Sequence, residues 1–437
     1  MGLESCPAPS CIKGPISAST KCLVGSILTG SDLPSAMANV EGEDDRFIVA
    51  FCGSGTGHLT QAMKVVEMLK ERGQTLAGVV TDSDASDKML NEMVRPLGVE
   101  ILIIPAIELV DTEKGFVPLI DPVRFVSSLL NSQESLHKQR ENYAAFFARA
   151  RAGIIYDMYH LTLARYLQLN PLPPSMRIVH MAAQFGLCEL TEQDTNTFIE
   201  VGSKAVMDIM RTIFVASGDT IPISPLARDN VLPPIIHVPT ALKPQTPRLI
   251  LCYFLVRTNA ERLDELLAAH PMPDVEFHCF TAKPLDAPRS QLRSHEKQRK
   301  LFQELFARCT GVIVSAGNET VWEAVSRGVP VLTIPTEGHG EQLLNAAVHA
   351  RNFPNLVQAR PRLEDSDIRW IAQFNLEDPG ARRESAHLRE RVTDFNTNGS
   401  PLLGGMSAAQ PESTAAALKR RVSDVLASAK SFVAGGS

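Results

Sequence analysis

The sequence has few aromatic residues and lacks the marks of several protein classes. Aromatic residues make up 6% of the 437 residues. No run of about 18 uncharged apolar residues is present, so no transmembrane helix is expected. The eight cysteines are scattered without a CxxC pair, which argues against a zinc site and is typical of reduced thiols in a cytoplasmic compartment. The net charge of −6 lacks the basic surplus of a nucleic-acid binder, so we expect no nucleic-acid partner.

What is present is an ordinary globular composition. Hydrophobic residues make up 44% and charged residues 21%, which excludes a disordered or collagen-like chain. At roughly 100–200 residues per domain, the length predicts two or three domains. Because the net charge is negative, an anionic ligand would have to be held by local groups rather than by a positive field of the whole molecule.

Residues 1–45 differ from the rest of the chain. They are rich in Ser, Pro, Gly and Ala and end in an acidic run, which predicts a disordered N-terminal extension. The short apolar stretch 22–28 and the small-residue triplet 36–38 leave a cleaved targeting segment as the alternative.

From Arg46 onward, apolar runs alternate with segments of helical periodicity, as in a parallel sheet covered by helices. The predicted strands of this part cover 47–52, 76–80, 99–105, 153–156, 178–182 and 213–216. The predicted helices cover 59–71, 88–97, 136–151, 160–169 and 196–211. This part is expected to form one Rossmann-like domain over 46–232.

Prolines then cluster between 222 and 247, which predicts a linker between domains. The alternation restarts with strands over 249–255, 275–280, 312–315 and 331–334, separated by helices over 260–269, 296–307 and 320–327. A second Rossmann-like domain is therefore expected over 233–394. Residues 395–411 are loop-like in composition, and 413–430 predict a last helix within a C-terminal segment 395–437.

The first chemical motif is the glycine-rich segment between strand 47–52 and the following helix. It contains Gly53, Gly55 and Gly57 and closes with His58. Glycines at a strand-to-helix turn let backbone N–H groups approach a phosphate, and the helix N-terminus adds partial positive charge. A Walker loop would need a Gly-Lys-Ser/Thr ending, which is absent here. A dinucleotide loop, a glycosyltransferase loop and a tight turn that binds nothing remain open.

The second motif is the segment 312–346, VIVSAGNETVWEAVSRGVPVLTIPTEGHGEQLLNA. It predicts a strand, a glycine turn, a helix that carries a glutamate, a Gly-x-Pro turn, a second strand and a loop that ends in Glu-Gln-x-x-Asn-Ala. Together with the first motif, this segment resembles the nucleotide-sugar glycosyltransferases of the GT-B type. Similar families are the UDP-dependent glycosyltransferases, the peptidoglycan GlcNAc transferase and their small archaeal and bacterial relatives. The resemblance implies two Rossmann-like domains that face each other across a cleft.

The resemblance also implies roles for individual residues. Ser315, Gly317 and Thr320 would hold the donor diphosphate with the loop glycines Gly55 and Gly57, and Glu323 would accept hydrogen bonds from the ribose. Glu341 and Gln342 would contact the transferred sugar. The plant relatives have a histidine where Ser315 stands and a tryptophan that stacks on uracil, for which no equivalent precedes Leu301. A UDP-sugar is expected, but these residues do not fix the nucleotide base.

The family's catalytic base corresponds to His58, and Asp157 stands where an aspartate orients that histidine. The resemblance implies an inverting, metal-independent transfer without a cofactor, from a nucleotide sugar to a hydroxyl of a small-molecule or lipid acceptor. His180 closes a strand near the expected cleft and is either a core histidine or an acceptor ligand. A basic helix around Phe146 and Phe147 either packs in the core or makes a peripheral membrane contact.

Three other functions compete. A sugar-nucleotide epimerase on the same fold would need further carboxylates in the cleft, and a non-catalytic sugar-nucleotide-binding subunit would need neither His58 nor Asp157. A nicotinamide-dependent dehydrogenase does not fit the second half of the sequence. The Asp82-Ser-Asp84 tripeptide matches the metal-binding pattern of the other glycosyltransferase fold, but a polar strand exit explains it as well.

Overall fold

The computed structural model describes residues 45–53, 57–107, 110–111, 115–116, 122–170, 172–173, 175–188, 204, 207, 215, 219–228, 230–237, 247–400 and 403. The predicted N-terminal extension, Gly55, the strand over 213–216 apart from residue 215, and the last helix over 413–430 lie outside the described residues. So does the helix over 196–211, apart from two positions.

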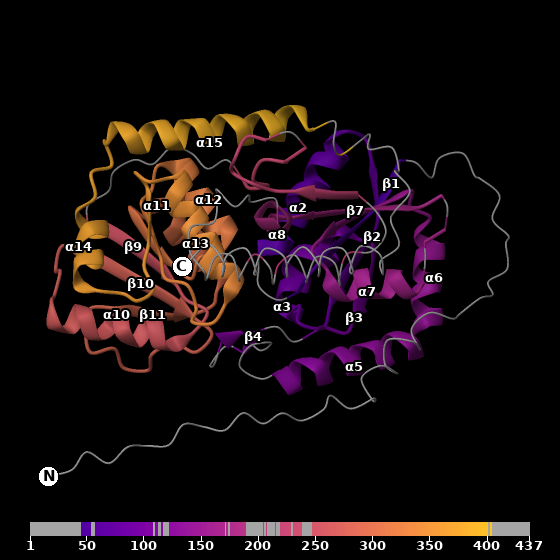
Figure 1. Ribbon diagram of the computed structural model, residues 1–437, viewed down its shortest axis with the longest axis horizontal. Coiled ribbons are helices and arrows are strands. Elements are labelled where there is room, and N and C mark those ends of the chain that lie inside the picture. The colour runs from indigo at the N-terminus through magenta and orange to yellow at the C-terminus, as the bar shows by residue number, and fades with distance from the viewer. Residues whose placement is uncertain are drawn as a thin grey trace, which may run out of the picture. The chain divides into compact units, whose positions relative to one another are not determined.

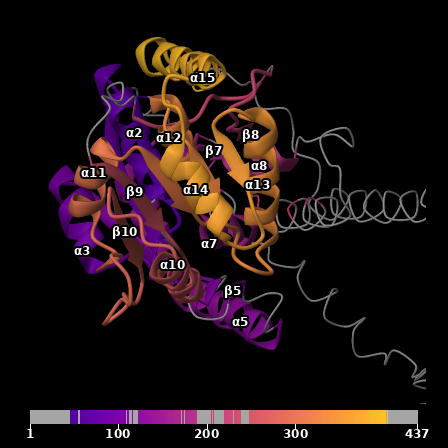
Figure 2. The same ribbon diagram turned by 90° about the vertical axis from the view of Figure 1, so that its left-hand side faces the viewer.

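The first half is built on a parallel sheet of six strands in the order β3-β2-β1-β6-β7-β8 (Figures 1 and 2). The strands are β1 (Arg46–Phe51), β2 (Thr75–Asp82), β3 (Glu100–Ile104), β6 (Ile154–Met158), β7 (Arg177–Ala182) and β8 (Asp219–Pro222). Side chains alternate between the two faces of each strand, and both faces are buried. In β1, Phe47 and Val49 pack with α2 (Gly57–Glu71), whereas Ile48 and Ala50 pack with α6 (Arg140–Ala150) and α7 (Leu161–Leu169).

The remaining elements of this half are shorter or peripheral. They are α3 (Asp87–Met89), which continues as a π-helical turn Leu90–Val94 and a 3₁₀ turn Arg95–Leu97, the hairpin β4 (Val110–Asp111) and β5 (Gly115–Phe116), α5 (Pro122–Lys138) and α8 (Ala183–Cys188).

The second half repeats the same strand order. Its parallel sheet runs β11-β10-β9-β12-β13-β14. The strands are β9 (Arg248–Tyr253), β10 (Val275–Thr281), β11 (Arg293–Glu296), β12 (Gly311–Val314), β13 (Val331–Thr333) and β14 (Val357–Ala359). The helices are α10 (Arg257–Ala269), α11 (Arg299–Arg308), α12 (Asn318–Arg327), α13 (Gly340–Asn352), α14 (Asp365–Gln373) and α15 (Pro379–Asn398).

Several sequence predictions at element boundaries were wrong. The predicted helix over 136–151 is divided near Gln139, and Glu296 ends an edge strand instead of starting a helix. Residues 395–398 belong to α15, so the predicted loop starts too early. The interdomain linker was placed from Pro222 onward, yet this proline closes β8, an edge strand where a missing N–H is tolerated.

The basic helix predicted around Phe146 packs in the core. Phe146 and Phe147 are buried in the cluster that covers one face of the first sheet, while Arg149 pairs with Glu100 at 2.5 Å on the surface. This agrees with the packed alternative, because the aromatic side chains face inward and the charges face solvent. No helix in the described part of the chain is long and apolar enough to cross a membrane.

The C-terminal helix connects the two halves of the sequence. Helix α15 packs on α12 (Figure 1). From α15, the Arg391 guanidinium donates to the carbonyls of Pro225 and Leu226, and Asn396 donates to the carbonyl of Ile236 at 3.2 Å. Beyond α15, the Leu403 carbonyl accepts a hydrogen bond from the Tyr156 hydroxyl at 2.9 Å. The chain therefore returns to the first half after completing the second.

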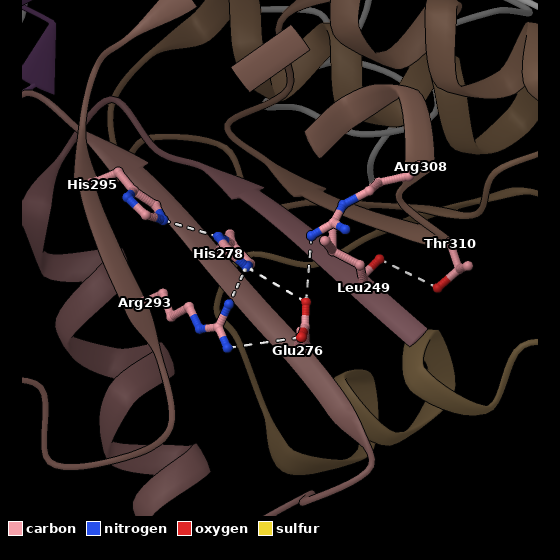
Figure 3. A network of polar contacts seen from close by, with 7 residues as sticks. All are labelled: Leu249, Glu276, His278, Arg293, His295, Arg308 and Thr310. Atoms are coloured by element: carbon pink, nitrogen blue, oxygen red, sulfur yellow. Dashed lines mark hydrogen bonds and ion pairs between the residues drawn. The ribbon is translucent and has the colours of Figure 1, made fainter. Parts of the chain in front are cut away.

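A polar network covers part of the second sheet (Figure 3). His278 of β10 lies 2.9 Å from His295 of β11 between ring nitrogens, and Glu276 lies 3.7 Å from Arg293 and 3.6 Å from Arg308. Burial, His295 and Arg293 lower the pKa of His278 to about 4, so its ring is neutral. These contacts tie the short polar strand β11 to the sheet.

Candidate functional site

The two predicted motifs follow β1 in the first sheet and β12 in the second. Open α/β sheets bind ligands at the carboxyl ends of their parallel strands, so both motifs lie where a ligand is expected. β1 and β6 are adjacent in the first sheet, and β9 and β12 are adjacent at the same place in the second. The turns after β6 and β12 each contain a non-glycine residue with positive φ, Tyr159 at 58° and Ala316 at 40°. Strained backbone of this kind is concentrated at functional sites.

The first glycine turn is held by Asp82. Its Oδ1 accepts hydrogen bonds from the backbone N–H of Gly53 at 3.0 Å and of Asp84 at 3.1 Å. A methyl group at Gly53 would collide with Asp82 and with the backbone of Ala85, so only glycine fits this close approach. The Asp82-Ser-Asp84 tripeptide is thus a polar turn at the end of β2, and its first carboxylate holds the glycine loop in place.

His58 lies on the first turn of α2, directly after this loop. Burial lowers the pKa of His58 below its usual value, against the opposing charges of Glu319, Asp157 and Asp82. Its Nδ1 is buried and has no hydrogen-bond partner among the described residues. Its ring centroid lies 6.1 Å from that of Tyr159, which in turn contacts Phe185 edge-on at 5.8 Å. His58 is therefore a neutral imidazole beside the aromatic rings of Tyr159 and Phe185.

Asp157 lies near the end of β6, and its two oxygens bond to neighbouring histidines. Oδ2 lies 2.6 Å from Nδ1 of His180, and Oδ1 accepts from the backbone N–H of His160 at 2.8 Å. The pairing with His180 follows from the sheet register, because Asp157 is directly opposite His180 on the neighbouring strand. Asp157 acts on His58 through its charge, and its role in orienting that ring stays a prediction.

Two further histidines flank Asp157. Nδ1 of His160 accepts from the backbone N–H of Leu163 at 3.3 Å, so the proton of a neutral His160 ring is on Nε2. His160 and His180 are both 1% exposed, and their Nε2 atoms have no partner within the described part of the chain. His180 is thus a buried histidine that bonds Asp157 through Nδ1, while its Nε2 has no partner among the described residues.

The second motif forms the start of α12 as predicted, with Gly317 as the N-cap residue. The Ser315 hydroxyl accepts from the backbone N–H of Leu255 at 3.1 Å, and Thr320 is the third residue of the helix. Gly317 is exposed, and space around its Cα is open. Backbone N–H groups of this first turn are available to an anion.

The residues predicted to bind the ribose and the sugar, Glu323 and Glu341, share one electrostatic environment. Burial and the charge of Glu319 raise the pKa of both Glu323 and Glu341 to about 7. Gln342 is buried, and its Oε1 accepts from the backbone N–H of Thr336 at 2.8 Å, so this side chain braces the loop. Asn345 braces the neighbouring turn by donating to the Ala316 carbonyl at 3.3 Å.

Gln61 and Glu319 were missed by the sequence analysis, whereas Gln184 follows the same strand as His180 and was expected near the cleft; all three take part in contacts between the two halves. Gln61 of α2 donates to Oε1 of Glu319 at 2.6 Å, and Gln184 of α8 donates to Oε1 of Glu341 at 2.9 Å. A methyl group at Gly57 would lie 2.5 Å from Oε2 of Glu319, so the carboxylate packs directly on the first loop. The described residues contain no group of three or more His, Cys, Asp or Glu side chains placed to hold a metal ion.

Comparison with known proteins identifies the fold. The glycotransferase of kitacinnamycin superposes with a TM-score of 0.53 and 13% identity, covering 82% of this chain and 97% of its own. The spinosyn rhamnosyltransferase SpnG gives 0.50 and 15% over 82% and 100%. UGT89C1 of Arabidopsis thaliana, solved with quercetin, gives 0.52 and 14% over 87% and 99%. The chain therefore has the GT-B fold of glycosyltransferases, with two parallel α/β sheets.

Sequence comparison adds a short local match. An uncharacterized glycosyltransferase of Methanosarcina acetivorans is 57% identical over 37 residues, which is 8% of this chain and 10% of that protein. The matched segment thus spans about a tenth of that relative's length. No family model matches the chain.

Proposed function

We propose that this protein is an inverting glycosyltransferase that moves a sugar from a nucleotide-sugar donor to an acceptor hydroxyl. The observation that carries the proposal is the approach of the two glycine turns. The first turn places the neutral His58, and the second presents the start of α12, with Gln61 and Glu319 hydrogen-bonded between them at 2.6 Å.

The donor is held mainly by the second half. Backbone N–H groups around Gly317 and the Thr320 hydroxyl bind the diphosphate, and the α12 dipole favours its negative charge. Ser315 supports this turn through its bond to Leu255. Glu323 binds the ribose of a UDP-sugar, and Glu341 binds the transferred sugar. The first-loop glycines Gly55 and Gly57 complete the phosphate site, and Gln342 shapes the sugar loop.

The chemical step is a direct displacement. His58 removes the proton of an acceptor hydroxyl as its oxygen attacks the anomeric carbon, and the bond to the diphosphate breaks on the opposite face. The fixed charge of Asp157 stabilises the imidazolium that forms. The α12 terminus stabilises the leaving diphosphate, so the proposed transfer needs no metal ion or cofactor.

The acceptor is a small molecule or a lipid that carries a hydroxyl. Tyr159 and Phe185 beside His58 support an acceptor with an apolar face. Cys252, Cys279 and Cys309 are buried and form no disulfide in the described part of the chain, which supports a reducing compartment such as the cytoplasm.

The first prediction concerns His58. With a panel of nucleotide sugars, we expect the wild-type protein to release nucleoside diphosphate slowly, with water as acceptor. His58→Ala should lower this turnover by about 10²–10⁴-fold, because the base is lost, and should leave donor affinity within a few-fold. His387→Ala, at an exposed position of α15, is the matched control.

A non-catalytic binding subunit would bind the donor without turnover in any variant. An epimerase would convert the donor sugar without releasing the nucleotide. Either result would replace the transferase proposal.

A further inference from the structure

Glu319 is a carboxylate in the place where the donor diphosphate is expected. It is in the first turn of α12, next to Thr320, and its side chain reaches the first glycine loop. Oε1 accepts the 2.6 Å hydrogen bond from Gln61, and Oε2 lies 2.5 Å from the Cβ position of Gly57. Both elements that would hold phosphate oxygens are therefore in contact with this one carboxylate.

Among the described residues, the Gln61 side chain makes one hydrogen bond, the one to Glu319. Its side chain is 1% exposed, and its Oε1 has no partner among the described residues, so its hydrogen bond to Glu319 is the contact that fixes it. A buried amide N–H that points at a carboxylate oxygen can equally donate to a phosphate oxygen. The Gln61 amide thus forms a small anion site beside Gly57, the Gln61–Gly57 oxyanion site, which the Glu319 carboxylate fills.

The charge of Glu319 also acts on its surroundings. It raises the pKa of Glu323 and of Glu341, and it is the strongest charge that opposes the effect of burial on His58. Glu319 and Glu323 of α12 and Glu341 of α13 thus give the site an acidic character. A diphosphate entering beside a fixed Glu319 would meet like charge at close range.

We propose that Glu319 competes internally with the donor diphosphate: its carboxylate occupies the Gln61–Gly57 oxyanion site, and donor binding requires the carboxylate to leave it. Gln61 then donates to the donor instead. Glu319 in this way limits the affinity for donor and for the released nucleoside diphosphate. This inference rests on the proposed function, because it assigns an additional determinant of affinity to the same donor site.

The test is calorimetric titration of UDP and of UDP-glucose into the full-length chain. Glu319→Gln removes the charge and keeps the size, and Glu319→Ala removes both. We expect each variant to bind UDP about tenfold more tightly than the wild type does. In the Glu319→Ala background, Gln61→Met should weaken UDP binding about fivefold again, because the oxyanion donor is then missing.

Glu304→Gln is the matched control, since it makes the same change of charge at an exposed position of α11. It should leave the affinity unchanged, and thermal melts establish that all variants are folded. If the wild type binds UDP and both Glu319 variants bind it equally or more weakly, Glu319 is not a competitor and this inference is wrong. If no nucleotide binds to the wild type or to any variant, the proposed function itself fails.

Discussion

At the scale of single residues, Asp157 is the best-defined charge of the candidate site. Two donors, the His180 ring and the His160 backbone, fix its two oxygens. Such a carboxylate is held in place by its donors and does not need to turn during a reaction. Its role in the proposed transfer is therefore electrostatic, acting on His58 through space rather than through a hydrogen bond.

Asp157→Asn tests this role. The variant removes the charge that raises the pKa of His58, so the acidic limb of the pH profile of kcat/KM should move to lower pH. Turnover should also fall about tenfold, which corresponds to about 1.4 kcal/mol of lost imidazolium stabilisation. Steady-state kinetics between pH 5 and 8 measure both effects. A loss of turnover with an unshifted limb would assign Asp157 a structural role instead.

The raised pKa of Glu323 makes the free energy of unfolding depend on pH. Its pKa is raised from 4.5 to about 7, so the folded protein keeps a proton that the unfolded chain releases in this window. The free energy of unfolding therefore falls as the pH rises from about 4.5 to about 7. Glu323→Gln removes this loss and should be more stable than the wild type at pH 8, by up to about 3 kcal/mol.

At pH 4 the same variant and the wild type should have equal stability in urea unfolding, because Glu323 is then protonated in both states. Glu304→Gln provides the control for a surface charge. If Glu323→Gln raised the free energy of unfolding by the same amount at pH 4 and pH 8, its effect would not come from titration of Glu323.

At the scale of elements, the site depends on two strand-to-helix turns of different construction. The turn after β1 is crowded around Gly53, whereas the turn after β12 leaves open space around Gly317. Gly317 has φ of −73°, which any residue can adopt. The first turn is thus specified by close packing, and the second by the backbone N–H groups that it exposes.

The two glycines should respond differently to alanine. Gly53→Ala introduces a buried clash with backbone and should lower the free energy of unfolding by about 1–3 kcal/mol. Gly317→Ala should change it by less than about 0.5 kcal/mol. Urea unfolding curves of both variants measure the difference, and equal effects would contradict this description of the turns.

Sequence patterns predicted the central elements better than the peripheral ones. Strands buried on both faces, such as β1 and β12, have unbroken apolar runs, and the helices between them have clear periodicity. Strand β11 is short and polar, so nothing in its composition separates it from a loop. Helix α15 was missed although Asp378 caps it and Pro379 opens it, an N-terminal signal that is present in the sequence.

In the candidate site, too, only features with a local sequence pattern could be predicted. The two glycine motifs are local and could be recognised, and a helix after the second turn followed from them, although it was predicted from residue 320 and begins at Asn318. The contact between Gln61 and Glu319 joins residues 258 positions apart, and no local pattern predicts it. The pairing of Asp157 with His180 follows from strand register, so a comparison of neighbouring strand ends could have found it.

At the scale of the whole molecule, two sheets of identical strand order supply complementary parts of the proposed transfer. In that proposal the first half contributes His58 as the base, with the aromatic residues beside it, and the second half contributes the start of α12 as the anion site. One apolar cluster runs continuously from residues around α2 to residues around α12, and Gln61–Glu319 and Gln184–Glu341 add polar contacts between the halves. The proposed transfer therefore requires the donor to bind at the second half, opposite His58.

Calorimetric titration of UDP, GDP and TDP into the wild-type chain, once with Mg²⁺ and once with EDTA, tests this requirement most directly. If backbone N–H groups and the α12 dipole hold the diphosphate as proposed, one of these nucleotides binds with the same affinity in Mg²⁺ and in EDTA. Absence of binding by every nucleotide, or binding that disappears in EDTA, would contradict it.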